Sequence, residues 1–281
     1  MKSFAAKVAA ITGAGSGIGR ALANDLAGRK CHLALSDIDE VGLAETARTA
    51  RAAGVQVTTQ KVDVSKRSEV EAWAKQVVAD HGKVNLIFNN AGVALGASIE
   101  GASYKDIEWL MSINFWGVVY GTKAFLPYLK ANGEEGCVVN TSSVFGLVSV
   151  PSQSAYNAAK FAVRGFTECL REELAMQDTQ VTALSVHPGG IKTNIARSAR
   201  MDDSVSDLGL SNGSDSDSRA KFEKAFITTP EKAAKIILSA VQHGRGRVLV
   251  GPDAHVIDWM ARLLPVHYQK FVIAFARRSM S

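Results

Sequence analysis

The chain has 281 residues, 47% of them hydrophobic, which is enough apolar material for one large domain with a buried core. Its 32 Lys and Arg against 27 Asp and Glu leave a net charge of +5, and no basic-aromatic motif accompanies it, so we expect no nucleic-acid partner. No uninterrupted apolar run approaches the roughly 18 residues that a membrane span needs.

Strand and helix signals alternate along the chain, which is the pattern of a parallel sheet covered on both faces. The predicted fold class is therefore α/β, a single doubly wound domain with about seven parallel strands. Strands are expected near residues 7–12, 31–36, 55–61, 84–88, 137–142, 181–186 and 247–250. Helices are expected near residues 20–29, 40–53, 67–81, 104–131, 154–174 and 230–242.

The first strand runs into a glycine-rich loop and a helix. Gly13, Gly17 and Gly19 form the spacing G-x-x-x-G-x-G. Glycine lets the backbone turn sharply and approach a ligand closely, and the new helix offers free N–H groups to a pyrophosphate. The second strand is followed by Asp37, near where an acidic residue takes the ribose hydroxyls of a dinucleotide.

A Tyr and a Lys, Tyr156 and Lys160, stand four residues apart at the start of the long helix, so both side chains lie on one face. An ammonium at about 4 Å is able to bring the pKa of tyrosine from about 10 towards neutral, which would make Tyr156 an acid/base. The hydroxyl of Ser143 follows the preceding strand and could hold a substrate oxygen. The plain alternatives are an ordinary amphipathic helix surface and a turn serine.

Together these residues resemble the short-chain dehydrogenase/reductase family, in its length class of about 250 residues. The motifs that carry the resemblance are Thr12-Gly13-x-x-x-Gly17-x-Gly19, Asp63-Val64, Asn89-Asn90-Ala91-Gly92, Asn114, Ser143, Tyr156-x-x-x-Lys160, and Pro188-Gly189 followed by Thr193. Each is weak alone, but they occur in the family's order and at its spacing.

The resemblance implies four catalytic residues. Ser143 orients the substrate oxygen, and Tyr156 removes or gives the proton. Lys160 lowers the pKa of the tyrosine and binds the nicotinamide ribose. Asn114 bends its helix and holds a water that connects Lys160 to solvent as a proton relay; a purely structural amide is the alternative.

The resemblance also implies a set of cofactor contacts and no metal. They are Gly13, Ser16, Gly17, Ile18, Gly19, Asp37, Ile38, Asp63, Val64, Asn90, Ala91, Gly92, Tyr156, Lys160, Pro188, Gly189, Ile191 and Thr193. Asp63 would meet the adenine amino group, or else serve only at the start of a helix. Ile191 and Thr193 would contact the nicotinamide carboxamide. For His187 we favour a structural role over a catalytic one.

Charge decides between the two nicotinamide cofactors. The carboxylate of Asp37 accepts both ribose hydroxyls of NAD and repels a 2′-phosphate, while Ser16 and Ile38 offer no cation for NADP. We therefore expect an NAD-dependent oxidoreductase that interconverts a secondary alcohol and a ketone. The apolar or small candidates for the substrate pocket, residues 93–95 and 144–150 with Gln153, favour a hydrophobic substrate. The alternatives are an NADPH-dependent carbonyl reductase and a non-catalytic dinucleotide-binding protein.

Two segments stand apart from this core. Residues 201–219 are polar and acidic, and we expect a mobile substrate loop there, with a plain surface loop as the alternative. After the catalytic domain, residues 1–251, the extension 252–281 contains two amphipathic helical stretches around Pro265 with several basic residues. This extension could lie on a membrane surface, cover an apolar pocket or pack against another subunit. By resemblance we expect a homodimer or homotetramer.

The three cysteines, Cys31, Cys137 and Cys169, have no metal or redox spacing. Two fall in core strands and one in a helix, so we expect reduced, structural thiols in a cytoplasmic protein. The apolar start of the chain has only a strand's length and leads directly into the glycine loop, which does not fit a signal peptide.

Overall fold

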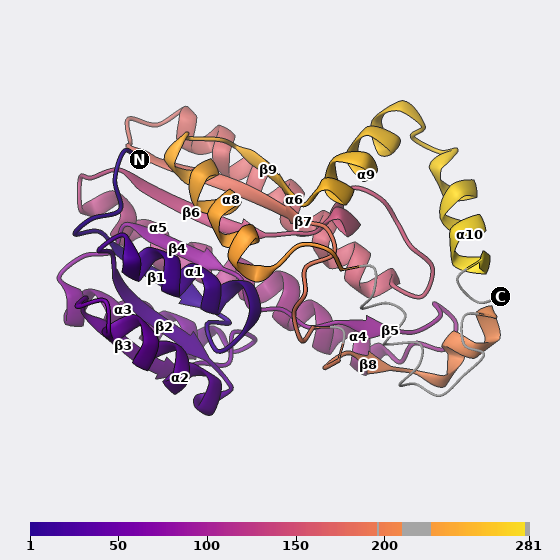
Figure 1. The fold of residues 1–281 in the computed structure, drawn as a ribbon, viewed down its shortest axis with the longest axis horizontal. Helices are drawn as coiled ribbons and strands as arrows, with labels where there is room; N and C mark the ends of the chain where they lie inside the picture. The colour runs from indigo at the N-terminus through magenta and orange to yellow at the C-terminus, as the bar shows by residue number, and fades with distance from the viewer. Residues whose placement is uncertain (196, 210–225, 279–281) are drawn as a thin grey trace.

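The computed structural model describes residues 1–195, 197–209 and 226–278. Seven strands form one parallel sheet in the order β3-β2-β1-β4-β6-β7-β9 (Figure 1). Their bounds are β1 Val8–Thr12, β2 His32–Asp37, β3 Val57–Lys61, β4 Leu86–Asn89, β6 Gly136–Thr141, β7 Val181–Pro188 and β9 Arg247–Val250. The predicted doubly wound fold is confirmed.

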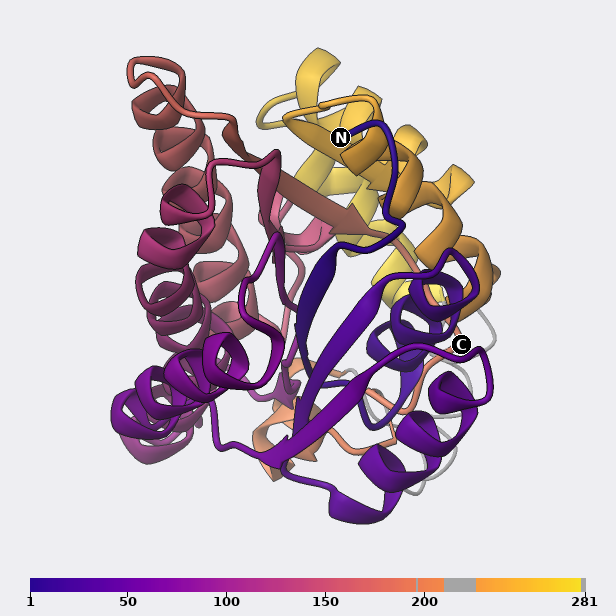
Figure 2. The same ribbon diagram turned by 90° about the vertical axis from the view of Figure 1, so that its left-hand side faces the viewer.

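Helices cover both faces of the sheet, as Figure 2 shows. One face carries α1 (Gly17–Gly28), α2 (Glu40–Arg51) and α8 (Pro230–Gln242), and the other carries α3 (Arg67–His81), α5 (Gly117–Ala131) and α6 (Ser154–Ala175). Because both faces are covered, the strands read as nearly continuous apolar runs. All five residues of β1 are buried.

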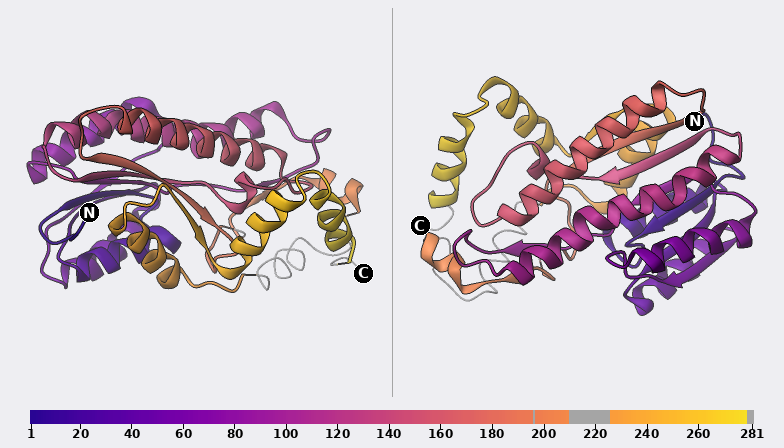
Figure 3. Two further views of the ribbon diagram at one scale, coloured as in Figure 1. Left: turned by 90° about the horizontal axis from the view of Figure 1, so that it is seen from above. Right: turned by 180° about the vertical axis from the view of Figure 1, so that it is seen from behind.

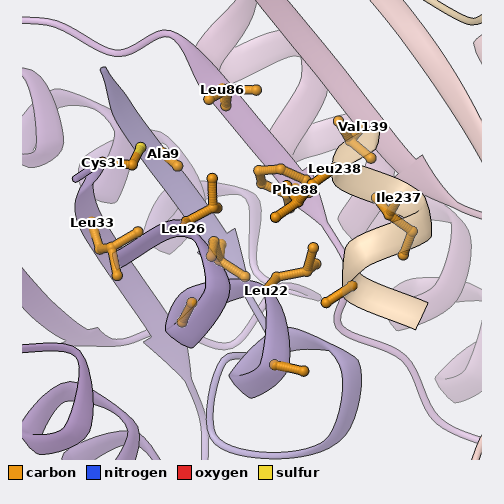
Figure 4. Packing of buried hydrophobic residues seen from close by; sticks show 14 of the residues in the cluster. Ala9, Leu22, Leu26, Cys31, Leu33, Leu86, Phe88, Val139, Ile237 and Leu238 are labelled. Carbon is orange, nitrogen blue, oxygen red and sulfur yellow. The ribbon is translucent and has the colours of Figure 1, made fainter. Parts of the chain in front are cut away.

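Apolar side chains fill the space between the sheet and each helical layer. On the first face, Leu22 and Leu26 of α1 pack with Phe88 of β4 and Ile237 of α8 (Figure 4). On the second face, the rings of Trp73 and Phe125 meet edge to face with centroids 5.0 Å apart. Each fully buried side chain of this size contributes roughly 1.5–3 kcal/mol.

The cysteines do not all lie in this core. Cys31 and Cys137 are buried as expected, but Cys169 is exposed on α6. The prediction of a structural thiol at Cys169 is therefore wrong, because the residue lies on the solvent side of an amphipathic helix. All three thiols are free.

The single helix expected over residues 104–131 is interrupted. It consists of α4 (Tyr104–Met111), a π-helical turn at Ser112–Trp116, and α5. Asn114 lies in this turn, and its amide makes two hydrogen bonds to the backbone of Val93: Nδ2 donates to the carbonyl and Oδ1 accepts from the N–H, both at 2.8 Å. A π turn widens the helix locally and is common at functional sites.

The described part of the expected substrate loop is fastened to the body of the protein. A short strand β8 (Arg200–Met201) pairs with β5 (Leu95–Gly96), and a 3₁₀ helix follows at Asp203–Leu208. The guanidinium of Arg200 lies 3.5 Å from the ring centroid of Trp109 and donates to Asp106 at 2.9 Å. The expected mobility of this segment stays a prediction, and residues 210–219 of it lie outside the described residues.

The extension forms α9 (Pro252–Leu263) and α10 (Tyr268–Arg278), two helices around Pro265 as predicted. They stand beyond the end of the sheet (Figure 3). Val256, Trp259 and Leu263 are each exposed to at least 64%. Across the part of the chain that the structure describes, no helix combines the length and hydropathy that crossing a membrane requires.

Candidate active site

The glycine loop forms a close-fitting turn between β1 and α1. A Cβ built on Gly19 would lie 2.0 Å from the carbonyl oxygen of Gly13, so only glycine fits there. Gly13 itself has φ +66°, which also favours glycine. Ser16 is the extended N-cap of α1, and among the described residues its side chain does not cap the helix. The first N–H groups of α1 therefore remain available to a pyrophosphate.

Asp37 lies at the carboxyl end of β2, beside this loop. Its Oδ2 accepts the N–H of Gly15 at 2.8 Å, and its Oδ1 accepts the N–H of Asp39 at 3.0 Å. A carboxylate has about four lone-pair sites, so each oxygen can still accept one ribose hydroxyl. The neighbouring Ile38 is 64% exposed and would lie open to the ribose side.

Sequence reasoning missed a cation close to this position. Arg20, in the first turn of α1, donates from Nε to the carbonyl of Gly15 at 3.2 Å and forms a 3.0 Å ion pair with Glu45. Arg20 directly follows the last motif glycine, Gly19, but the sequence does not show that its side chain turns back to the carbonyl of Gly15. Because the guanidinium is already bonded to a carbonyl and a carboxylate, its charge is partly satisfied within the chain.

The other predicted cofactor residues line the same edge of the sheet. The hydroxyl of Thr12 accepts the N–H groups of Asn90 and Ala91 at 3.0 and 3.1 Å, which ties the turn after β4 to the glycine loop. Asp63 accepts from both the N–H and the hydroxyl of Ser65, as in a turn that leads into a helix. Val64 is buried, and Ile18 packs against the core.

The catalytic candidates lie at the junction of β6 and α6. Tyr156 is half-buried, and the side chain of Ser143 lies close enough to act on the pKa of its phenol. The Ser143 hydroxyl also accepts the N–H of Phe145 at 3.1 Å. The ring of Phe145 stands perpendicular to that of Tyr156, with centroids 6.0 Å apart. The structure thus brings the predicted serine and tyrosine together.

Lys160 completes this group from the next turn of α6. Its side chain is buried, its Nζ donates to the carbonyl of Thr141 at 2.9 Å, and the same atom lies 5.4 Å from the ring centroid of Tyr156. A Cβ built on Gly92 would lie 3.7 Å from this Nζ and 3.3 Å from Oδ1 of Asn114. All four predicted catalytic side chains therefore converge on one place.

The expected direction of the tyrosine pKa is not found. Burial raises the pKa of Tyr156 to about 12, and the hydrogen bond from Ser143 offsets only part of that effect. Burial also lowers the pKa of Lys160 to about 8. The prediction that Lys160 moves the tyrosine towards neutral pH fails here because desolvation of the phenolate outweighs a cation 5.4 Å from the ring.

Two residues hold the segment between Ser143 and Tyr156 in place. His187 is fully buried, and its Nδ1 donates to the backbone carbonyl of Ser143 at 2.9 Å, as the structural role preferred from sequence requires. Asn157, which sequence reasoning missed, donates from Nδ2 to the carbonyls of Phe145 and Val148, both at 2.9 Å. Its position next to Tyr156 was the only available signal.

The loop after β7 faces the start of α1. A Cβ built on Gly17 would lie 3.0 Å from the methyl carbon of Thr193, so the two motifs touch. Ile191 is buried and bridges to Thr228. Pro188 ends β7, and the next residue, Gly189, donates its N–H to a carbonyl of β9.

A second missed residue, Asp253 of α9, supports this loop from behind. Its Oδ2 accepts the N–H of Gly190 at 2.6 Å. A Cβ built on Gly189 would lie 2.1 Å from the same oxygen, so the carboxylate and a side chain at 189 exclude each other. The extension therefore contributes directly to the shape of the predicted nicotinamide site.

Comparison with known proteins agrees with this geometry. The profile of the family described as short chain dehydrogenase matches residues 7–204. A Mycobacterium tuberculosis protein named as the oxidoreductase SadH is 49% identical over 276 residues, which cover 98% of this chain and 96% of that protein. Estradiol 17-beta-dehydrogenase 11 of Macaca fascicularis is 38% identical over 197 residues, 70% of this chain and 65% of its own length.

A solved structure extends the likeness over the whole fold. The short chain dehydrogenase/reductase of Burkholderia phymatum, crystallised in complex with NAD, superposes with a TM-score of 0.84 and 34% identity. The alignment covers 96% of this chain and 97% of the other. With the matched profile, the parallel sheet and the converging motifs, the chain belongs to the short-chain dehydrogenase/reductase family.

Proposed function

We propose that this protein is an NAD-dependent oxidoreductase that interconverts a secondary alcohol and a ketone. The observation that carries the proposal is the convergence of Ser143, Tyr156 and Lys160 at the junction of β6 and α6, with Nζ of Lys160 5.4 Å from the tyrosine ring and Ser143 close enough to act on the pKa of the phenol. A protein that only bound a dinucleotide would need none of this acid/base chemistry.

Each side chain has a role in alcohol oxidation. Ser143 binds the substrate oxygen, and Tyr156, in the deprotonated form that its raised pKa confines to alkaline pH, takes the hydroxyl proton while the carbinol carbon loses a hydride. NAD⁺, when bound, supplies the acceptor for that hydride at C4 of its nicotinamide. Lys160 binds the nicotinamide ribose, and the site of Asn114 beside Gly92 suits a water that returns the proton to solvent.

Asp37 supports NAD as the cofactor. Its two oxygens lie at the end of β2 with acceptor capacity left for two ribose hydroxyls. The charge of Arg20, which could otherwise attract a 2′-phosphate, is already engaged by Glu45. The Burkholderia phymatum relative was crystallised with NAD, in agreement with this choice.

A hydrophobic substrate fits the segment between Ser143 and Tyr156. Phe145 packs against the catalytic ring, and Val144, Leu147 and Val148 are buried around it. Few charges are present to bind a sugar or an acid. The name of the relative estradiol 17-beta-dehydrogenase 11 points to an apolar alcohol for that protein, and we extend the same substrate class to this one.

Pairing of two copies through α5 and α6 completes the proposal. Trp116, in the π-helical turn that leads into α5, is 47% exposed, where a partner could cover it. Light scattering of the purified protein should show a dimer or tetramer, and Trp116→Ser should shift it towards the monomer. A wild-type monomer would refute this part.

The activity is tested by binding and turnover together. NAD and NADP are titrated by calorimetry, and the better cofactor is used with a panel of secondary alcohols of increasing chain length. Tyr156→Phe should lose nearly all turnover and keep cofactor binding. The control Tyr128→Phe, far along α5, should keep both turnover and cofactor binding. Near-normal turnover by Tyr156→Phe would overturn the assignment.

A further inference from the structure

Tyr268, the first residue of α10, joins the C-terminal extension to the segment between the two catalytic candidates Ser143 and Tyr156. It is only 7% exposed, whereas Val266 and Phe271 on either side of it are 66% and 59% exposed. A tyrosine is seldom buried without a partner for its hydroxyl. The position of that partner is informative.

The hydroxyl of Tyr268 accepts the backbone N–H of Ser149 at 3.0 Å. Ser149 lies midway in the segment that joins Ser143 to Tyr156, at a separation of 119 residues from Tyr268. The bond therefore connects the C-terminal extension to the stretch of backbone between the two catalytic hydroxyls.

The rest of this segment is held from the catalytic body. Asn157 bonds Phe145 and Val148 from one side and accepts the N–H of Val150 at 3.2 Å. Gln153 forms a bridge with Ala97. Between these fixed points Ser149 is exposed, and Tyr268 is the acceptor for its N–H.

We propose that Tyr268 is a positioning residue that sets the shape of the substrate-facing segment through Ser149. The inference rests on the proposed function. It assigns the extension a part in substrate selection rather than in the proton or hydride step.

The two catalytic hydroxyls are held independently of Tyr268. Ser143 is held by His187 and by the end of β6, and Tyr156 belongs to α6. Loss of the Tyr268 bond should therefore leave the reacting groups in place. It should change only the wall that a bulky substrate meets.

There is room for that wall to move. A groove of about 540 Å³ separates the segment and α6 from α10, and Val150, Pro151, Phe161, Val272 and Ile273 line it. Asn157 holds Val148 and Val150 from the side of α6, and the bond from Tyr268 holds the intervening Ser149 towards α10. Without that bond, water can take the N–H of Ser149, and the backbone at Ser149 can shift into the groove.

The test compares Tyr268→Phe with Tyr128→Phe, which removes a half-buried hydroxyl from the far end of α5. With NAD as cofactor, we expect KM for 2-decanol to rise about fivefold in Tyr268→Phe, the size that loss of one hydrogen bond produces. Its kcat, its KM for 2-propanol and its Kd for NAD should stay within about twofold of wild type. Tyr128→Phe should match wild type in every value.

A merely structural role would give a different pattern, with kcat and KM changing for both alcohols or with NAD binding weakened, and that pattern would overturn the proposal. Hydrogen exchange provides a readout that needs no turnover. The amide of Ser149 should exchange faster in Tyr268→Phe while the amides of α6 stay unchanged.

These two readouts distinguish a failure of the positioning role of Tyr268 from a failure of the proposed function. If wild type oxidises no alcohol, the proposed function fails and hydrogen exchange alone decides: an unchanged Ser149 amide overturns the contact, and a faster one supports it. If wild type is active and Tyr268→Phe has unchanged KM for 2-decanol, the positioning role fails while the proposed function stands.

Discussion

Nδ1 of His187 donates a 2.9 Å hydrogen bond to the backbone carbonyl of Ser143, and its Nε2 accepts from the hydroxyl of Ser185, also at 2.9 Å. The carbonyl can only accept, which fixes the neutral tautomer with the proton on Nδ1. Burial lowers the pKa of His187 to about 4. An imidazole with so low a pKa is a weak proton acceptor near pH 7, and both of its ring nitrogens are already hydrogen-bonded, so the residue holds the backbone at Ser143 in place.

The first prediction concerns stability in acid. The unfolded imidazole takes a proton near pH 6.5 and the folded one only near pH 4, so the unfolded chain binds more protons between these values. The contribution is full above pH 6.5 and is lost as pH falls towards 4, by about 3 kcal/mol. Urea unfolding at pH 7, 5.5 and 4.5 should show this slope, and His187→Gln should flatten it.

His255→Gln, at an exposed site on α9, is the matched control and should keep the slope of wild type. An equal slope in wild type and His187→Gln would mean that other groups cause the acid sensitivity. His81, whose pKa is also lowered by burial, would then be the next candidate.

The second prediction is that Lys160 opposes stability while it serves catalysis. Its folded pKa, about 8, lies below the ordinary value of 10.5, so the unfolded chain binds more protons between pH 8 and 10.5 and stability rises with pH across that window. At pH 7 the buried charge costs about 3 kcal/mol. Lys160→Met removes this cost and loses the bond to Thr141, worth about 1 kcal/mol.

Lys160→Met should therefore be inactive and yet more stable than wild type by about 2 kcal/mol at pH 7. The difference should shrink as pH rises from 8 to 10, which thermal or urea unfolding across that range would detect. Lys105→Met, an exposed site on α4, should change neither stability nor its pH dependence. A Lys160→Met variant that is less stable at pH 7 would contradict the argument.

The fold was predictable because its signals are local and repeated. The bounds predicted for α3, α8 and β9 agree with the structure. Local signals mark the two helices: Thr229 caps α8 with Pro230 following it, and α3 ends at Gly82, whose φ is +74°. The ends predicted for other helices and strands differ from the observed ends by a few residues. The resemblance implied that Asn114 bends its helix, but the π-helical form of that bend was not predicted, since the hydrogen bonds that Asn114 makes there reach the backbone of Val93, 21 residues away in the chain.

The residues of the candidate site also fall into those that local sequence signals identify and those that only the folded chain brings together. Residues inside family motifs could be named from the sequence because spacing identifies them. Arg20, Asn157, Asp253 and Tyr268 could not, since each acts through a backbone group that only the folded chain brings near. The pKa of Tyr156 was misjudged because the sequence shows a neighbouring charge and does not show how far the phenol is removed from water.

The third prediction tests the cofactor choice. The double variant Asp37→Ser with Ile38→Arg removes a negative charge near the ribose and adds a positive one at a 64% exposed position. A 2′-phosphate would then be attracted rather than repelled, and the ratio of kcat/KM for NADP over NAD should rise about a hundredfold or more. Ile38→Arg alone should give a smaller rise, because Asp37 remains.

The last prediction concerns Asp253, which supports the loop at Gly189 and Gly190 as Tyr268 supports the other side of the site. Asp253→Ala removes the acceptor for the Gly190 N–H and opens space behind Gly189, so calorimetry should show the Kd for NAD rising about tenfold. In Asp253→Asn the side-chain oxygen can still accept that bond, so much of the affinity should return. Tyr268→Phe should leave NAD binding unchanged, which separates the two contacts. Equal NAD affinity in wild type and Asp253→Ala would show that the nicotinamide loop keeps its shape without the extension.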